Sequence, residues 1–336
     1  MEKRQIGRSD LQVSVVGLGG NVFGPPRLDQ RGSIRNIHRA QDLGINFIDT
    51  AAIYGQGNSE SYIGNALKDR QSDWIVATKF TLENLGDETP AERITRQTEE
   101  SLKALKRDAI DLLQIHFPRP NVPPEVILEV LNKFVIAGKV RYVGACNYSS
   151  WRQAAAIHVA RASGLPEFVS SQNHYNLLNR FPELELLRFC AAYEIGFLPY
   201  FPLAAGLLTG KYRPGKAPPP GSRGAARSPA LNSARTPRNE AIVEQLDAWA
   251  RARDHSVAEL AIAWLLARPV VSSVITGTSS VEQVETNAKA ASWRLTDSEI
   301  ADVDAIARWD GSGEGLEGER MLAGTRSPGA ASPRPR

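Results

Sequence analysis

Four side chains that could together move a proton lie between residues 49 and 116. Asp49 ends the apolar run INFID, Lys79 ends WIVATK and His116 ends IDLLQIH, while Tyr54 follows Asp49 by five residues. The ordinary pKa of a phenol, about 10, is too high for easy proton donation at neutral pH. A neighbouring Lys79 ammonium would lower the pKa of Tyr54, and an Asp49 carboxylate would keep Lys79 charged. These residue types therefore predict a tyrosine general acid, with His116 orienting the reacting oxygen or assisting the proton transfer.

Each of the four residues also has an ordinary structural role open to it. Asp49 could cap a turn, and Lys79 could be a charge at the rim of the fold. His116 could be a hydrogen-bonded histidine with no part in chemistry, and Tyr54 could anchor a loop. Chemistry is favoured because three of the four end three consecutive apolar runs.

The elements that would position these residues are eight short apolar runs that alternate with amphipathic stretches of helical length. The first run, VSVVGLG, surrounds Val15, and the other seven end at Asp49, Lys79, His116, Cys146, Gln172, Tyr200 and Thr276. Apolar strands alternating with helices predict a parallel sheet covered by helices, and a count of eight favours a closed (β/α)8 barrel. In such a barrel the active site lies at the carboxyl ends of the strands.

The expected organisation is a single α/β domain, a TIM barrel over residues 1–310 that opens with a short hairpin formed by KRQIG and LQVSVV. Segment 213–238 holds six Lys or Arg, six Pro and three Gly, with no Asp or Glu. This composition predicts an exposed flexible loop that joins no helix or strand, with closure over an anionic ligand as the alternative. Residues 311–336 contain nine Pro plus Gly and are expected to form a disordered tail.

Boundary signals accompany several of the expected helices. Thr89 precedes Pro90, and Glu92 follows Thr89 by three residues, which predicts a capped N-terminus. Four glycines stand where C-terminal caps belong: Gly44, Gly138, Gly164 and Gly196.

Composition excludes several classes of protein. The chain of 336 residues is 42% apolar and 23% charged, which excludes a disordered or collagen-like chain. Its net charge is +3, and without the six cations of 213–238 the remainder carries −3, so no nucleic-acid partner is expected. With no apolar window of about 18 residues and no secretory leader, we expect no membrane partner and a cytoplasmic location. Two cysteines without CxxC spacing, and five histidines without HxH or HExxH, predict no metal site.

Over roughly residues 3 to 309 the sequence resembles the aldo-keto reductase superfamily. The matching stretches are GLGGNVFG, GINFIDTAAIYGQGNSE, VATKF, LLQIHFP, GKVRYVGACNYS, SQNHYNLLNR, YFPLAAGLLTGKY and ITGTSSVEQVETN. The resemblance implies that Asp49, Tyr54, Lys79 and His116 form a catalytic tetrad in an oxidoreductase that reduces aldehydes or ketones to alcohols. It also implies a nicotinamide cofactor, NADPH rather than NADH, and a small carbonyl compound as substrate.

The resemblance further implies which residues bind the cofactor. Asn147 and Gln172 would hold the carboxamide, and Tyr200 would stack on the nicotinamide ring. The remaining expected contacts run from the nicotinamide ribose through the pyrophosphate to the adenosine phosphate: Gly20, Asn21, Asp49, Pro202, Leu203, Lys211, Gly277, Thr278, Ser279, Gln283 and Asn287. A helix N-terminus near the last five suits an anion.

Some positions depart from the family pattern. Cys146 stands where Ser is commoner, which weakens one carboxamide contact because a thiol is a poor donor. The other departures are Phe201 for Ser, Thr286 for Glu, and Gly277 and Gln283 for Lys and Arg. They leave Lys211, Ser279 and an arginine of segment 213–238 for the cofactor's additional phosphate.

Rival interpretations are weaker. A Rossmann fingerprint needs a glycine where Val22 stands, and the one Tyr-x-x-x-Lys, from Tyr212 to Lys216, encloses Pro and Gly. A cofactor-binding regulatory or scaffold subunit that senses redox state stays open. An aromatic mouth for hydrophobic substrates and simple rim packing are both compatible with four aromatic residues: Phe23, Tyr54, Phe80 and Phe117.

Overall fold

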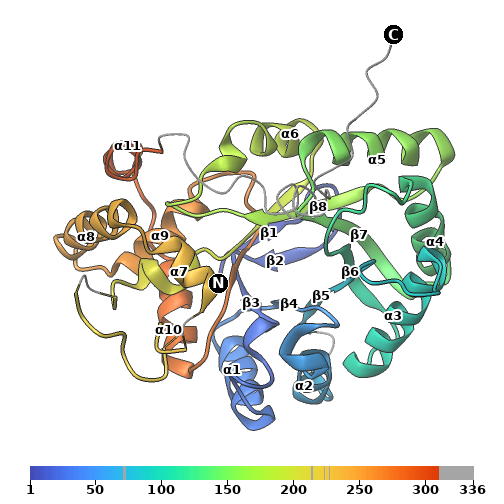
Figure 1. Ribbon diagram of the computed structural model, residues 1–336, viewed down its shortest axis with the longest axis horizontal. Coiled ribbons are helices and arrows are strands. Elements are labelled where there is room, and N and C mark those ends of the chain that lie inside the picture. Colours follow the sequence, from blue (N-terminus) through green and yellow to red (C-terminus); the bar gives the residue numbers. More distant parts are fainter. Residues whose placement is uncertain (71–72, 213–214, 223, 227, 310–336) are drawn as a thin grey trace, which may run out of the picture.

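The computed structural model describes residues 1–70, 73–212, 215–222, 224–226 and 228–309 and shows the expected barrel. Eight parallel strands surround a common axis (Figure 1). The strands are β3 (Val16–Gly19), β4 (Phe47–Asp49), β5 (Ile75–Phe80), β6 (Ile110–Ile115), β7 (Val140–Cys146), β8 (Phe168–His174), β9 (Gly196–Tyr200) and β10 (Val274–Thr276). The predicted (β/α)8 fold is therefore confirmed.

The strands follow one another around the ring in chain order, from β3 to β9, with β10 beside β3. Between β9 and β10 the ladder is short: Phe197 N donates to Val270 O at 2.9 Å, and Ser272 N donates to Phe197 O at 3.0 Å. The barrel thus closes through the residues just before β10.

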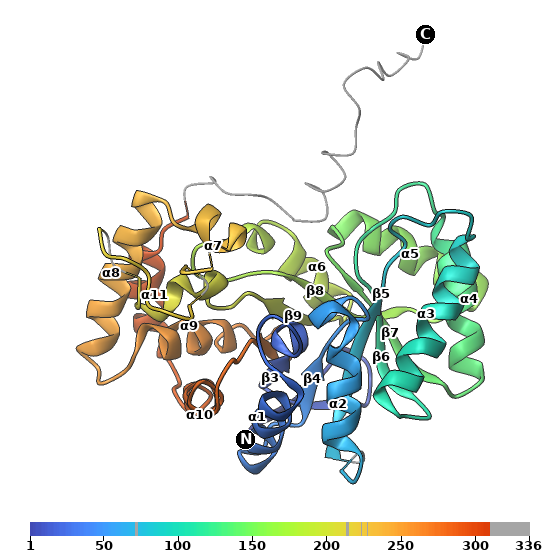
Figure 2. The ribbon, with the colours of Figure 1, turned by 60° about the horizontal axis from the view of Figure 1, so that its bottom comes forward.

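Helices cover the outside of the barrel (Figure 1). Figure 2 shows α1 and α2 beside the strands β3 and β4. The helices are α1 (Gln30–Asp42), α2 (Ser59–Leu67), α3 (Pro90–Leu105), α4 (Pro124–Ile136), α5 (Ser150–Ser163), α6 (Leu186–Ala192), α7 (Pro229–Ala234), α8 (Pro237–Arg251), α9 (Val257–Leu266), α10 (Val281–Ala290) and α11 (Asp297–Ile306). Because the strands are parallel, the connections that follow their carboxyl ends all lie at the same mouth of the barrel.

The predicted hairpin closes the opposite mouth. Strands β1 (Lys3–Gln5) and β2 (Gln12–Ser14) pair antiparallel. The hairpin residues Ile6, Leu11 and Val13 are fully or almost fully buried and pack with inward-facing strand residues such as Phe47 and Leu198. This apolar plug leaves the carboxyl ends of the strands as the side on which a ligand can enter.

Helix boundaries agree in part with the expected caps. Thr89 and Glu92 form a reciprocal capping box before α3, and Gly164 caps α5 in the left-handed region with φ 64°. The expectation for Gly196 is wrong, because Glu194 adopts the left-handed conformation with φ 53° and Gly196 begins β9. A Cβ at Gly196 would lie 2.6 Å from Ser272 Oγ, so close packing explains the glycine.

Segment 213–238 contains helix, contrary to expectation. Helix α7 lies within it, and α8 begins at Pro237. Prolines in the first turns of both helices suit helix starts, and Leu231 of α7 is fully buried. The flexibility of the segment stays a prediction; residues 213–214, 223 and 227 and the expected tail 311–336 lie outside the described residues.

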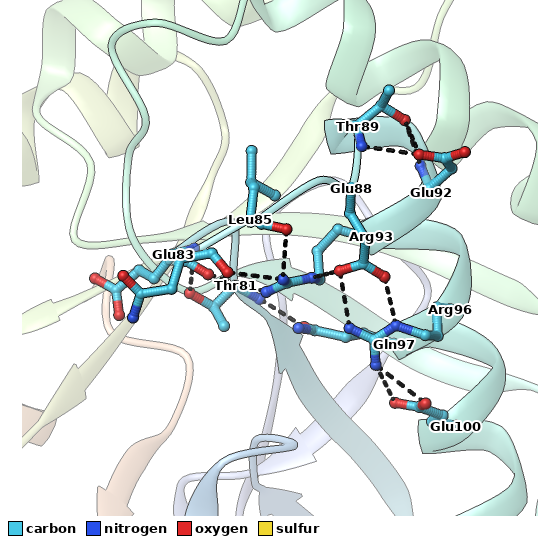
Figure 3. A network of polar contacts seen from close by, with 11 residues as sticks. Thr81, Glu83, Leu85, Glu88, Thr89, Glu92, Arg93, Arg96, Gln97 and Glu100 are labelled. Carbon is cyan, nitrogen blue, oxygen red and sulfur yellow. Dashed lines mark hydrogen bonds and ion pairs between the residues drawn. The ribbon is translucent and has the colours of Figure 1, made fainter.

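Arg93 and its neighbours hold the connection between β5 and α3 (Figure 3). The Arg93 guanidinium donates to the carbonyl oxygens of Glu83 and Asn84 at 2.9 Å and of Leu85 at 3.3 Å. Glu88 pairs with both Arg93 and Arg96. This connection directly follows the strand that carries Lys79. Arg93 of α3 therefore stabilises a segment of backbone next to the barrel mouth.

Candidate active site

A cleft of about 660 Å³ opens at the carboxyl ends of the strands. It extends from the barrel mouth to the first turn of α10. Most residues expected at the site line it: Asn21, Asp49, Tyr54, His116, Asn147, Gln172, Tyr200, Pro202, Leu203, Lys211, Gly277, Ser279, Gln283 and Asn287. Lys79, Gly20 and Thr278 do not line it, and all three are buried behind its surface.

An ion pair between Lys79 and Asp49 lies beneath the cleft. Lys79 Nζ donates to Asp49 Oδ2 at 2.6 Å and to Thr50 O at 2.8 Å. The other carboxylate oxygen, Asp49 Oδ1, accepts from Gln172 Nε2 at 2.8 Å and from Gln114 Nε2 at 3.2 Å. The Lys79 side chain is fully buried, so its charge is compensated by these neighbours rather than by water.

Tyr54 lies above this pair, on the short helical turn η2 (Tyr54–Gly57). Its hydroxyl is 3.4 Å from His116 Nε2, and Lys79 Nζ is 5.0 Å from the centre of its ring. Gly55 follows with φ 58°, and a Cβ there would lie 2.0 Å from Phe23 O. The turn therefore requires glycine at this position, and it directs the phenol into the cleft. All four residues of the expected tetrad meet at one place.

The protonation states differ in part from expectation. Burial raises the pKa of Tyr54 to about 12, and the nearby Lys79 ammonium offsets this only in part. The expected net lowering is therefore wrong, although the Lys79 contribution has the expected sign. Burial also opposes the Lys79 charge, but the neighbouring groups, Asp49 foremost, together outweigh burial and raise the pKa of Lys79 above its ordinary value. Burial and the Lys79 charge hold the pKa of His116 well below its ordinary value. At neutral pH the centre thus contains a charged lysine, a neutral phenol and a neutral imidazole.

The side chains expected around the carboxamide form one hydrogen-bonded chain. Tyr200 Oη donates to Asn147 Oδ1 at 2.7 Å, and Asn147 Nδ2 donates to His116 O at 3.0 Å. Asn147 adopts a left-handed conformation with φ 62°. Cys146 Sγ lies 3.6 Å from Gln172 Oε1, a distance typical of a weak thiol contact. The chain connects the wall of the cleft to the ion pair below.

The far end of the cleft has features that suit an anionic ligand. Helix α10 begins there, with Ser280 as its N-cap, and Lys211 lines the same cavity. Gln283 Oε1 accepts from Ser279 N at 2.9 Å, which orders the first turn. Asn287 is 3% exposed, and its Nδ2 has no hydrogen-bond partner among the described residues. A buried amide without an acceptor is costly, so this atom points to a missing ligand group.

The sequence analysis missed several residues that line the cleft. They include Arg27, Ser222 and Ser256. Ser256 and Glu259 form a capping box at the start of α9, a pattern visible in the sequence, but only the fold brings that helix to the cleft. Ser222 belongs to the segment for which closure over an anion is the alternative interpretation, and that closure stays a prediction.

The four aromatic residues considered for the mouth divide into two pairs. Tyr54 and Phe117 line the cleft, whereas Phe23 and Phe80 are buried in the core and do not line it. Phe117 stacks on His116 with ring centres 4.5 Å apart. The prediction of an aromatic mouth therefore applies to Tyr54 and Phe117, and the prediction of packing applies to Phe23 and Phe80.

No group of three or more His, Cys, Asp or Glu side chains that could hold a metal ion occurs in the described residues. Within the same described ranges, every helix is too short or too polar to span a membrane.

Comparison with known proteins gives one consistent result. The model of the Aldo/keto reductase family matches residues 15–308. Aldo-keto reductase AMT2 of Alternaria alternata is 34% identical, covering 88% of this chain and 89% of that protein. Aldo-keto reductase YhdN of Bacillus subtilis is 32% identical, covering 91% and 93%. A protein named putative voltage-gated potassium channel subunit beta, from Schizosaccharomyces pombe, is also 32% identical, covering 90% and 92%.

Proposed function

We propose, from the premise that this chain belongs to the aldo/keto reductase family, that it reduces aldehydes or ketones to alcohols with NADPH and with Tyr54 as the general acid. NAD(P)H-dependent carbonyl reduction is the general activity of that family. The observation that carries the finer proposal is the position of the Tyr54 hydroxyl. It lies 3.4 Å from His116 Nε2, above the buried Asp49–Lys79 pair and inside the cleft.

The residues of the cleft fit a nicotinamide dinucleotide. Asn287 Nδ2 is buried and has no partner in the described part of the chain, and the first turn of α10 with Lys211 offers positive charge. Together they support a phosphate-bearing ligand and, through Ser279 beside that turn, the additional phosphate of NADPH. Asn147 and Tyr200 would hold the nicotinamide end. When bound, the reduced nicotinamide supplies the hydride for the carbonyl carbon.

The proton for the carbonyl oxygen comes from Tyr54. With a pKa of about 12 the phenol remains protonated at neutral pH. It can donate to an oxygen that gains alkoxide character, because such an oxygen is the stronger base. The Lys79 ammonium stabilises the phenolate that remains, and Asp49 keeps Lys79 charged. The neutral His116 imidazole lies where it can orient the reacting oxygen by a hydrogen bond.

A cofactor oxidation assay tests this function. Purified protein is mixed with NADPH and a panel of neutral aldehydes, and the absorbance band of reduced nicotinamide is followed. We expect that band to decay only when an aldehyde is present, and faster with NADPH than with NADH. Failure of every carbonyl to increase the decay rate would contradict the proposal.

A second candidate function is that of a nicotinamide-binding regulatory or scaffold subunit with little turnover. The observation in its favour is the 32% identity to a protein named as a potassium channel subunit beta. Tight NADPH binding without turnover of any carbonyl would favour this candidate. Measurable turnover that depends on Tyr54 would favour the reductase.

A further inference from the structure

The connection between β3 and α1 forms a rim of the cleft next to Tyr54. Within it Gly24 N donates to Leu28 O at 2.9 Å, and Arg27 N donates to Gly24 O at 3.0 Å. A Cβ at Gly24 would lie 2.7 Å from the Cα of Gly55, the residue after Tyr54. The two backbones therefore touch, and the backbone of Arg27 is held at the same end of the cleft as the phenol.

The charges that line the cleft are unevenly compensated. Besides the neutral His116, the ionisable side chains in the lining other than tyrosine and cysteine are Arg27, Asp49 and Lys211. The Asp49 carboxylate is occupied by Lys79, Gln114 and Gln172. Among the described residues, the cleft therefore presents two cations and no available carboxylate to a ligand. Such a cavity favours anionic ligands.

Arg27 has no partner for its guanidinium within the part of the chain that the structure describes. The nearest carboxylate in the sequence, Asp29, accepts from Gly32 N at 2.7 Å and caps α1. Lys211 lies on the connection after β9, which with α10 forms the far end of the cleft. Of the cations that the structure describes in the lining, Arg27 is thus the one that remains for the end at which the carbonyl reacts.

We propose that Arg27 is a specificity-determining residue that binds a carboxylate on the carbonyl substrate. The proposal rests on the proposed reductase function and narrows its substrates to small aldehydes or ketones that carry an acid group away from the carbonyl. A guanidinium presents parallel N–H donors that match both oxygens of a carboxylate. Val22 and Phe117 line the cleft as well and offer apolar contacts to the part of the substrate between the two groups.

The test compares two aldehydes of similar shape, para-carboxybenzaldehyde and the neutral para-tolualdehyde. In the wild-type protein kcat/KM should be higher for the acid, and added salt should reduce that preference. In Arg27→Gln the preference should fall about tenfold through KM, with the neutral aldehyde unaffected. Arg31→Gln is the matched control, because Arg31 of α1 is exposed like Arg27 but does not line the cleft. It should leave both rates unchanged.

An equal loss of kcat/KM for both aldehydes in Arg27→Gln would overturn the proposal. A larger NADPH dissociation constant in that variant would also overturn it, because Arg27 would then belong to the cofactor site. Calorimetry with the two alcohol products and the NADPH-bound protein tests Arg27 independently of turnover. If the wild-type protein binds para-(hydroxymethyl)benzoate no better than para-methylbenzyl alcohol, Arg27 does not recognise a carboxylate. If no aldehyde is reduced but the acid alcohol binds better through Arg27, the proposed reaction is wrong and the anion site remains.

Discussion

Two ion-pair clusters in this barrel have similar distances and different surroundings. Lys79 and Asp49 are 2.6 Å apart, with side chains 0% and 3% exposed. Arg96 and Glu88 are 2.7 Å apart, with side chains 45% and 30% exposed (Figure 3). Water screens the second pair and not the first, so the charge of the buried pair acts more strongly on groups that lie beyond the pair itself.

The two clusters also act on different parts of the structure. Hydrogen bonds from Arg96 and Arg93 lower the pKa of Glu88 to about 2, yet Glu88 does not line the cleft that holds Tyr54. What the exposed cluster does is hold Arg93 against the carbonyls of the connection after β5. The buried pair holds a charge below the Tyr54 phenol. The exposed network thus stabilises the backbone of the connection after β5, and the buried pair places a positive charge next to the phenol of Tyr54.

The largest effect is expected from Lys79→Met, which breaks the buried pair. It leaves the Asp49 carboxylate without its cation, at a cost of about 3–5 kcal/mol in the free energy of unfolding, and it removes turnover. Urea unfolding and the aldehyde assay measure the two effects. The double variant Asp49→Asn with Lys79→Met should recover stability but not activity. Wild-type stability of Lys79→Met would show that the pair is not buried as described.

Tyr54→Phe separates chemistry from stability in the same region. Without the hydroxyl the proposed general acid is lost, so kcat should fall about 10³-fold. The affinity for NADPH, measured by fluorescence titration, should be nearly unchanged. Equal losses of turnover and cofactor affinity would mean that Tyr54 has a structural role.

The exposed cluster should respond to Arg93→Gln with a change of intermediate size. This variant removes the donors to three backbone carbonyls, so we expect a loss of about 2 kcal/mol in the free energy of unfolding. Arg96→Gln is the control at the same cluster and should cost less than about 1 kcal/mol. Thermal unfolding compares the two, and equal losses would contradict the assignment of Arg93 as the fastening residue.

The smallest effect concerns pH. Tyr54 has its pKa raised to about 12 and His116 has its pKa well below 6.5, so neither titrates near neutrality. The kcat for reduction should therefore be flat between about pH 6 and about pH 9. An inflection of kcat near pH 6.5 would assign a titrating role to His116.

The Glu88 carboxyl, with its pKa lowered, contributes stability to the fold. This stability is present above the ordinary pKa of 4.5 and is lost as the pH falls towards 2.

Local patterns were enough to predict the strands and several helix ends. The runs that end at Asp49, Cys146 and Tyr200 are strands that end at those residues. The Thr89 capping box also follows from residues three positions apart. Gly196 was misjudged because its neighbours Ser272 and Gly7 are distant in the chain.

The sequence by itself determined the alternation of strands and helices and the residue types at the strand ends, because apolar periodicity and caps act over a few neighbouring residues. The tertiary structure alone decided the raised pKa of Tyr54, the lack of a partner for the Asn287 amide among the described residues, and the presence of Arg27 in the cleft that holds the phenol. Those properties depend on burial and on contacts between segments far apart in the chain, and no local pattern encodes them.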